Sequence, residues 1–250
     1  MTKAKNSGEN FNPMTITLPS GLTVTLKPMT GRAERVLEDK KLYKTGALVD
    51  RYMMECIETI GDKETMTPQE KEKALLEMLS GDRNYLLMAI RIEGFGPDMI
   101  FTSTCPKCGK DSGYQINLQD KLDDGTFPVI PYQDAPQRIE LPVSGGYAEI
   151  GYMTGQRERQ MAQLPDNAIH QGMLLRIESL NGERPTLKDL ENMHGRDLLA
   201  LRAAMGNMRG GLDSTIELDC GECGASYKIS IASVPDFFVP SMTSLESAGI

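Results

Sequence analysis

Two short cysteine turns constrain the fold of this 250-residue chain more than any other feature of its sequence. Residues 105–109 read CPKCG, and residues 220–224 read CGECG. Short runs typical of β-strands flank each turn, at 99–102 and 114–118 and at 215–218 and 227–231. A Cys-x-x-Cys turn directs two thiolates to the same side, and the glycine that follows permits backbone angles that a side chain disfavours. Two such turns in matching contexts indicate a metal site.

The spacing of the two turns predicts which parts of the chain such a site would join. A local zinc ribbon places its cysteine pairs about 15–20 residues apart, whereas more than one hundred residues separate Cys108 from Cys220. Two separate sites would each need two further ligands, and the chain has only two histidines, His170 and His194. We therefore expect one structural zinc ion per chain, held by four thiolates in a closed shell. The predicted ligands are Cys105, Cys108, Cys220 and Cys223.

Other interpretations of the cysteines are less favoured. An iron–sulfur cluster or disulfides remain open as alternatives. A thiol–disulfide active site needs its first cysteine at the start of a helix, which lowers the pKa of that thiol. Here Gly109 and then an apparent strand follow the first pair, so redox catalysis is disfavoured. The fifth cysteine, Cys56, lies in an apolar helical run and is predicted to be a buried core thiol.

The two halves of the chain read as copies of one another. Four segments of the first half recur in the same order in the second, and a cysteine turn comes last in both: residues 18–21 and 141–145, 29–35 and 153–159, 57–61 and 177–182, and 76–83 and 190–197. A repeat longer than one hundred residues exceeds the period of solenoid proteins. The pattern instead predicts a duplicated domain that forms two pseudo-symmetric lobes.

The expected fold is α+β, with a β-hairpin, helices and a cysteine knuckle in each lobe and a shared four-cysteine zinc site between them. The predicted organisation is a flexible leader at 1–13, a first lobe at 14–118, a linker at 119–137, a second lobe at 138–235 and a tail at 236–250. The linker contains three prolines and an Asp-Asp-Gly turn, a composition that resists regular structure.

Periodicity and capping signals predict the helices. Apolar residues spaced four apart predict a helix over 47–60, and the second half repeats it over 167–180. Thr67 begins a Thr-Pro-Gln-Glu capping box, and Thr186 begins a similar box with aspartate in place of glutamate. Two adjacent phenylalanines, Phe237 and Phe238, either dock on the protein's own core or bind a partner.

Composition narrows the possible functions. The formal net charge is −8, which argues against general nucleic-acid binding because phosphate contacts require clustered lysine and arginine. No window approaches the ~18 apolar residues of a membrane span, so we expect a cytosolic protein without membrane contact. The histidines have no nucleophile and acid in a recognisable arrangement, so we expect no enzyme. Four arginines in the repeated helix either face solvent or bind acidic partners: Arg32, Arg35, Arg157 and Arg159.

The order of these motifs resembles that of a known family. The order is a Leu-Pro-Ser-Gly hairpin, a Met-Thr-Gly-Arg helix start, a strand into Cys-Pro-x-Cys-Gly, a second Cys-x-x-Cys-Gly and a terminal Phe-Phe-x-Pro. From about residue 18 to residue 240, the chain resembles the phage baseplate protein family related to hub-assembly components of T-even contractile-tailed phages. The resemblance implies a virion protein at the tail tip, in which the four cysteines of the two turns are structural zinc ligands.

The resemblance also implies the partners and the location. We expect a structural component of the tail baseplate that contacts other tail proteins, is present in several copies per particle, and passes through the host cytoplasm during assembly. Two alternatives remain open. One is an assembly chaperone that is absent from the finished virion, and the other is a zinc-knuckle nucleic-acid-binding protein.

Overall fold

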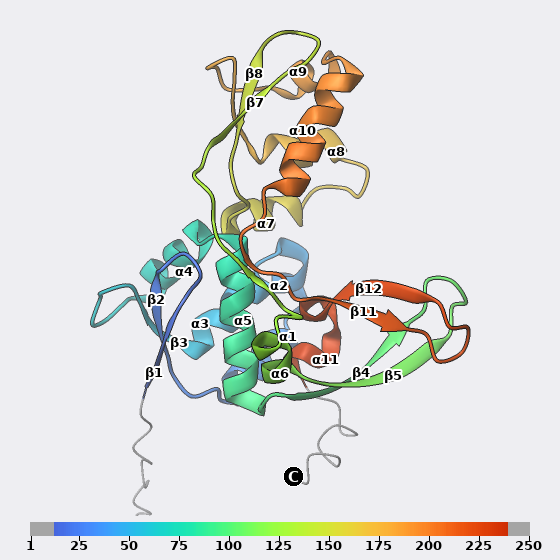
Figure 1. The fold of residues 1–250 in the computed structure, drawn as a ribbon. Coiled ribbons are helices and arrows are strands. Elements are labelled where there is room, and N and C mark those ends of the chain that lie inside the picture. Colours follow the sequence, from blue (N-terminus) through green and yellow to red (C-terminus); the bar gives the residue numbers. More distant parts are fainter. Residues whose placement is uncertain (1–12, 240–250) are drawn as a thin grey trace, which may run out of the picture.

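The computed structural model describes residues 13–239 and contains two lobes of unequal size (Figure 1). Most of the predicted leader (1–13) and most of the predicted tail (236–250) lie outside the described residues. Helices and strands are mixed throughout, which confirms the α+β class. The large lobe consists of residues 14–130 and 211–238, and the small lobe consists of residues 137–209.

The large lobe begins with a three-stranded antiparallel sheet and five helices. These elements are β1 (Met14–Thr17), β2 (Thr23–Leu26), α1 (Gly31–Leu37), α2 (Lys40–Thr45), α3 (Leu48–Cys56), β3 (Ile57–Ile60), α4 (Pro68–Glu77) and α5 (Ser80–Phe95). The sheet order is β1-β2-β3. Strand β2 buries Val24 and Leu26 and turns its two threonines outward, the alternation expected of a half-buried strand.

The helix predicted over 47–60 is wrong at its C-terminal end. Helix α3 ends at Cys56, and Ile57–Ile60 forms strand β3 against β2. Three of these four residues are β-branched, and pairing with β2 gives their backbone groups hydrogen-bond partners. Apolar residues four apart fit a buried helix, but a short apolar run at the end of that pattern fits a strand equally well.

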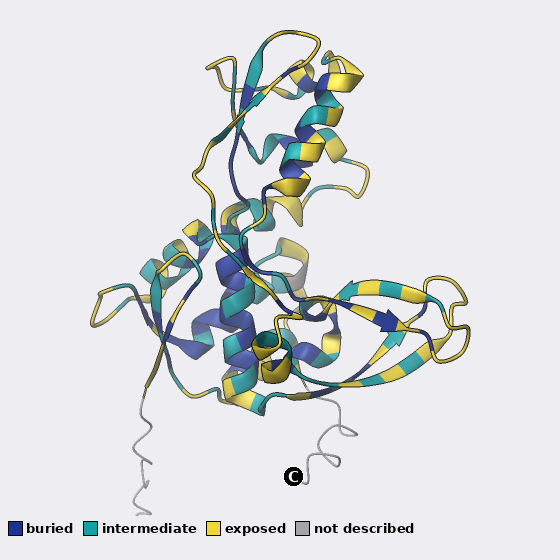
Figure 2. Cartoon of the chain, in the orientation of Figure 1, coloured by how far each residue is buried: buried dark blue, intermediate teal, exposed yellow. Residues whose placement is uncertain are grey.

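The capping box at Thr67 is confirmed, because its hydroxyl accepts from the backbone N–H of Glu70 while the Glu70 carboxylate accepts from that of Thr67. Helix α5 then crosses the centre of the large lobe (Figures 1 and 2). Its buried face includes Leu86, Met88 and Ile90.

A hairpin of β4 (Asp98–Thr104) and β5 (Asp111–Asn117) leaves the large lobe and carries the first cysteine turn at its tip. Helix α6 (Leu118–Asp123) and β6 (Val129–Ile130) follow. The expectation that 119–137 lacks regular structure is therefore wrong for its first part. Leu118 and Phe127 are both fully buried in the core, which fixes this segment in place.

The small lobe follows the order of the first elements of the large lobe, with one helix fewer between its second and third strands. It contains β7 (Gln137–Glu140), β8 (Tyr147–Ile150), α7 (Gly155–Met161), α8 (Ile169–Leu174), β9 (Ile177–Leu180), α9 (Leu187–Glu191) and α10 (Gly195–Asn207). Its sheet order is β7-β8-β9, with a register shift in β8 where β2 has one. The helix predicted over 167–180 is wrong in the same way as its counterpart, because the chain enters β9 at Ile177. The capping box at Thr186 is confirmed.

The chain then returns to the large lobe. Strand β10 (Gly211–Leu212) pairs with β6, and β11 (Thr215–Asp219) and β12 (Ser226–Ser230) form the second cysteine hairpin. A 3₁₀ turn, η1 (Ile231–Ser233), and helix α11 (Pro235–Phe238) end the described chain.

Two hydrophobic cores hold these lobes. Residues from β10 to Val234 belong to the core of the large lobe, although their positions fall within the predicted second lobe: Leu212, Ile216, Leu218, Ile231 and Val234. Phe237 of the predicted tail belongs to the same core. The second hairpin therefore packs with the first half of the chain. The predicted domain boundaries stay a prediction. Of the two interpretations of the paired phenylalanines, docking on the protein's own core is the one observed, because Phe237 is buried there and Phe238 packs edge-on against Tyr52.

Candidate metal centre

The two cysteine hairpins have the same backbone construction. In the first, the Cys105 N–H donates to the Lys110 carbonyl, and the Gly109 N–H donates to the Cys105 carbonyl. The second repeats both bonds, with Cys220, Ala225 and Gly224 in the matching places. Both glycines lie in the left-handed region, with φ of 71° at Gly109 and 65° at Gly224. A side chain would strain the backbone there, which accounts for the glycine after each pair.

The fold brings the two turns together. The four Sγ atoms of Cys105, Cys108, Cys220 and Cys223 all lie within 4.8 Å of one another. Across the hairpins, the Cys105 and Cys223 sulfurs are 3.8 Å apart, and the Cys108 and Cys220 sulfurs are 3.7 Å apart. A tetrahedron with Zn–S bonds of about 2.3 Å has edges of about 3.8 Å. The sulfur positions therefore fit a four-thiolate zinc site.

Burial and backbone donors distinguish the four sulfurs. Cys105 and Cys220 are buried, whereas Cys108 and Cys223 are exposed. Backbone N–H groups of Cys223 and Glu222 lower the pKa of the Cys220 thiol to about 6, and the backbone N–H of Cys108 lowers the pKa of Cys105. Such donors stabilise the thiolate, which is the form that binds a metal.

The pKa of Cys108 moves in the opposite direction. The backbone N–H of Lys110 lowers the pKa, but local desolvation beside the neighbouring sulfurs and hydrogen bonds with them together raise it to about 11. Four thiolates this close repel one another unless a cation lies between them. The cluster thus has the four sulfur donors of a metal site, and a bound cation would relieve the repulsion between their thiolates.

Side chains around the cluster join one hairpin to the other. Lys110 pairs with Glu222 at 2.9 Å, and the Tyr114 hydroxyl lies 3.0 Å from that of Tyr227. Tyr114 also donates to the Asp219 carbonyl. Since the four sulfurs would fill a tetrahedral shell, a bound ion would keep no position for water or substrate. The arrangement can fasten two hairpins together, and it is not built for hydrolysis.

The other residues singled out in the sequence lie elsewhere. Cys56 is a buried core thiol, as expected. His194 caps α10, because its Nδ1 accepts from the Arg196 N–H. Arg157 and Arg159 are predicted to face solvent or to bind acidic partners. In the structure both pair within the chain, Arg157 with Glu178 and Arg159 with Asp50 in the junction between the lobes.

That junction is a charged network that the sequence did not reveal. Asp50, only 1% exposed, accepts from Arg83 at 2.7 Å and from Arg159 at 2.7 Å. Arg83 also donates to Glu158, and Arg159 also donates to Glu72. These bonds tie α7 of the small lobe to α3, α4 and α5 of the large lobe. One signal in the sequence points to it: Asp50 lies three and four residues before the buried Met53 and Met54, so a carboxylate stands on an apolar face of α3.

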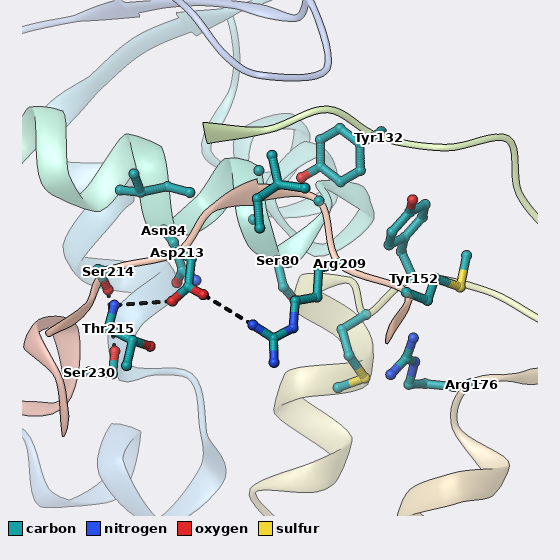
Figure 3. A pocket seen from close by; sticks show the side chains of 17 residues that line it. Ser80, Asn84, Tyr132, Tyr152, Arg176, Arg209, Asp213, Ser214, Thr215 and Ser230 are labelled. Carbon is teal, nitrogen blue, oxygen red and sulfur yellow. Dashed lines mark hydrogen bonds and ion pairs between the residues drawn. The ribbon is translucent and has the colours of Figure 1, made fainter. Parts of the chain in front are cut away.

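A cavity of 380 Å³ lies at the same seam, beside β10 and the start of α5 (Figure 3). Arg209 pairs with Asp213 at its edge, and the buried hydroxyls of Ser80 and Tyr132 have no hydrogen-bond partner within residues 13–239. Neither histidine lines this cavity.

Comparisons with known proteins agree with the family resemblance. A family model described as T4 bacteriophage base plate protein matches residues 12–239. Neither the search among curated proteins nor the search among solved structures gives a match. Within the part of the chain that the structure describes, no helix has the length and apolar content needed to cross a membrane.

Proposed function

This chain belongs to the T4 bacteriophage base plate protein family, and we propose that it is a structural component of the baseplate hub region that bridges neighbouring tail proteins. This proposal rests mainly on the extent of the family match, which spans both lobes and both cysteine turns. Family membership implies a place in the phage tail. The finer role in the hub is supported by the construction of the molecule, which has two lobes and a four-cysteine cluster that fastens two distant hairpins.

We propose that Cys105, Cys108, Cys220 and Cys223 hold one structural zinc ion per chain. The distances across the hairpins and the lowered pKa values of Cys105 and Cys220 support this. Zinc binding free energy would add to folding free energy, because the ligands come together only in the folded chain. Native mass spectrometry should find one zinc per chain, and iron or no metal would contradict the proposal.

We also infer that the two units β1–α5 and β7–α10 descend from one duplicated domain. Their sheets share strand order and the position of the register shift. Backbone bonds recur at matching places: Gly61 N–H to Thr23 and Asn181 N–H to Tyr147, then Lys27 N–H to Cys56 and Gly151 N–H to Arg176. A buried aspartate in the first turn of α5 or α10, Asp82 or Asp197, binds the hairpin turn in each unit.

The deciding experiment is quantification of this protein in purified phage tails by mass spectrometry. A structural component should be present at a fixed number of copies per particle, comparable with other baseplate proteins. Detection in infected cells but not in finished virions would instead support an assembly chaperone. Salt-sensitive binding to DNA in a gel-shift assay would favour the nucleic-acid alternative, which the net charge of −8 opposes.

A further inference from the structure

The junction between the lobes has two complementary halves. We call residues 153–159 at the start of α7 the donor half, and the α4–α5 turn with the adjoining faces of α3, α4 and α5 the acceptor half. The Ser80 N–H donates to the Met153 carbonyl at 2.9 Å, and the Gly155 N–H donates to the Met78 carbonyl at 3.0 Å. Gly155 allows this approach, because a Cβ there would lie 2.4 Å from the Leu75 carbonyl oxygen.

The charged network completes this junction. Arg159 of the donor binds Asp50 and Glu72 of the acceptor, and Glu158 of the donor binds Arg83 of the acceptor. Each half is part of a unit that occurs twice in the chain. The large lobe therefore carries its own copy of the donor, and the small lobe carries its own copy of the acceptor.

The copy of the donor is residues 29–35, at the start of α1. Ala33 and Met29 pack on the core of the large lobe, whereas the side that corresponds to the junction is exposed. Gly31 corresponds to Gly155, yet a Cβ at Gly31 would meet nothing within 4 Å. Within residues 13–239, neither the Gly31 N–H nor the Met29 carbonyl has a hydrogen-bond partner. Glu34 and Arg35, which correspond to Glu158 and Arg159, are exposed. A hollow of 410 Å³ adjoins Gly31.

The copy of the acceptor is the α9–α10 turn, and it is uncovered too. His194 precedes α10 as Leu79 precedes α5, so Gly195 corresponds to Ser80, one position from the pairing with Gly81 that the sequence repeat predicts. In the described part of the chain, the Gly195 N–H and the Met193 carbonyl have no hydrogen-bond partner. Glu191, two residues before Met193, is exposed and offers a carboxylate close to this turn, and Ile169 of α8 is 62% exposed.

We propose that residues 29–35 of one copy of this protein dock on the α9–α10 turn of a second copy. The contact would reproduce the internal junction, with the Gly195 N–H donating to Met29, the Gly31 N–H donating to Met193, and Arg35 pairing with Glu191. Because donor and acceptor are different surfaces, the contact is heterologous and generates a ring or a filament rather than a two-fold dimer. The inference rests on the proposed duplication and gives the proposed bridging role a partner.

The contact between copies would be weaker than the internal junction. His170 replaces Asp50 and Leu198 replaces Arg83 in the acceptor copy, so the buried ion pairs are not repeated. Apolar contact with Ile169 and the Arg35–Glu191 pair remain. We therefore expect reversible self-association that depends on protein concentration. On dilution the copies should dissociate while both lobes stay folded.

Sedimentation velocity of the purified full chain over a range of concentrations tests the proposal. The wild-type protein should self-associate, and Gly31→Leu or Arg35→Glu should weaken association about tenfold or more, equivalent to about 1.4 kcal/mol. Gly31→Leu places its side chain in open space in the monomer, so circular dichroism should show an unchanged fold. Lys40→Glu, the same charge change on an exposed residue outside the docking segment, is the matched control and should leave association unchanged.

A charge exchange gives an independent test. Arg35→Glu and Glu191→Arg should each weaken self-association, whereas an equimolar mixture of the two, or one chain carrying both changes, should associate again. A wild-type chain that stays monomeric at every concentration up to about 1 mM would overturn the proposal, because even a weak specific contact has a Kd below that concentration. So would a dimer that Gly31→Leu leaves intact. Neither result bears on whether the protein is present in purified tails, so the proposed function is tested separately.

Discussion

At the scale of single residues, the four clustered thiols behave as one set although their surroundings differ. Backbone donors favour the thiolate at Cys105 and Cys220, whereas Cys108 is held toward the neutral thiol by its neighbours. A metal ion would remove this conflict, because it favours all four thiolates at once. The stability of the site therefore belongs to the set and not to either hairpin.

The first prediction follows from that shared dependence. Cys105→Ser and Cys220→Ser should each abolish stoichiometric zinc binding, and to the same extent, because each removes one ligand from the same shell. Metal content by inductively coupled plasma mass spectrometry is the measurement. Cys56→Ser is the control, since burial raises the pKa of Cys56 to about 12 and keeps it a neutral core thiol. Retention of half the metal by one of the ligand variants would point to separate sites.

A second residue-scale prediction concerns Asp50. Asp50→Ala should lower the free energy of unfolding by roughly 3–5 kcal/mol, because it breaks the buried pair with Arg83 and the pair with Arg159 and leaves Glu158 as the carboxylate partner of Arg83. Urea denaturation measures the change. Lys73→Met is the control, since its pair with Glu77 is exposed on both sides, and such pairs are worth at most about 1 kcal/mol. Equal effects of the two changes would contradict the assignment of Asp50 to a buried network.

At the scale of elements, the two capping boxes are comparable local devices in different lobes. Thr67→Ala and Thr186→Ala should each cost about 1 kcal/mol, the usual value of a helix N-cap. Hydrogen exchange of the first-turn amides of α4 and α9 should report each loss in its own helix. A loss of protection in both helices from either single change would show that the boxes are not local.

The box in α4 also predicts a pH dependence. Hydrogen bonds from Lys63 and then from Thr67 lower the pKa of Glu70 to about 2, below the ~4.3 of an unfolded glutamate. A lowered folded-state pKa stabilises the protein above pH ~4.3, and this stabilisation is lost as the pH falls towards 2. The difference in stability between wild type and Glu70→Gln should therefore shrink over that interval in acid titrations. A difference that grows with acidity would contradict the box.

At the scale of the whole molecule, the cysteine cluster and the junction between the lobes fasten different parts. The cluster joins β4 and β5 to β11 and β12, all of which pack with the large lobe. The small lobe has its own core around Ile150 and Leu201. Loss of the metal should therefore loosen the large lobe without releasing the small one.

Chelation of the metal tests this division. After treatment with a strong chelator, amides of the two cysteine hairpins should lose hydrogen-exchange protection first, while amides of β8 and β9 keep theirs. The melting temperature should fall as well, because metal binding free energy is part of folding free energy. Simultaneous loss of protection in both lobes would show that the clasp supports the whole chain.

The sequence by itself determined the local features of this protein. Local features depend on residues that are close together in the chain, so a short stretch of sequence predicts them. Examples are the turns at Gly109 and Gly224, the capping boxes at Thr67 and Thr186, and the alternation of buried and exposed residues in β2. The grouping of the four cysteines was also predictable, because a shared site needs four ligands and the chain offers few others.

Only the tertiary structure decided the rest, because it depends on contacts between distant residues. Ile57–Ile60 and Ile177–Leu180 are strands because β2 and β8 supply their backbone hydrogen bonds. The second cysteine hairpin packs with the large lobe because the core there accepts Ile216 and Leu218. Asp50 can remain charged and buried only where two arginines from different elements meet it, an encounter that no local pattern encodes.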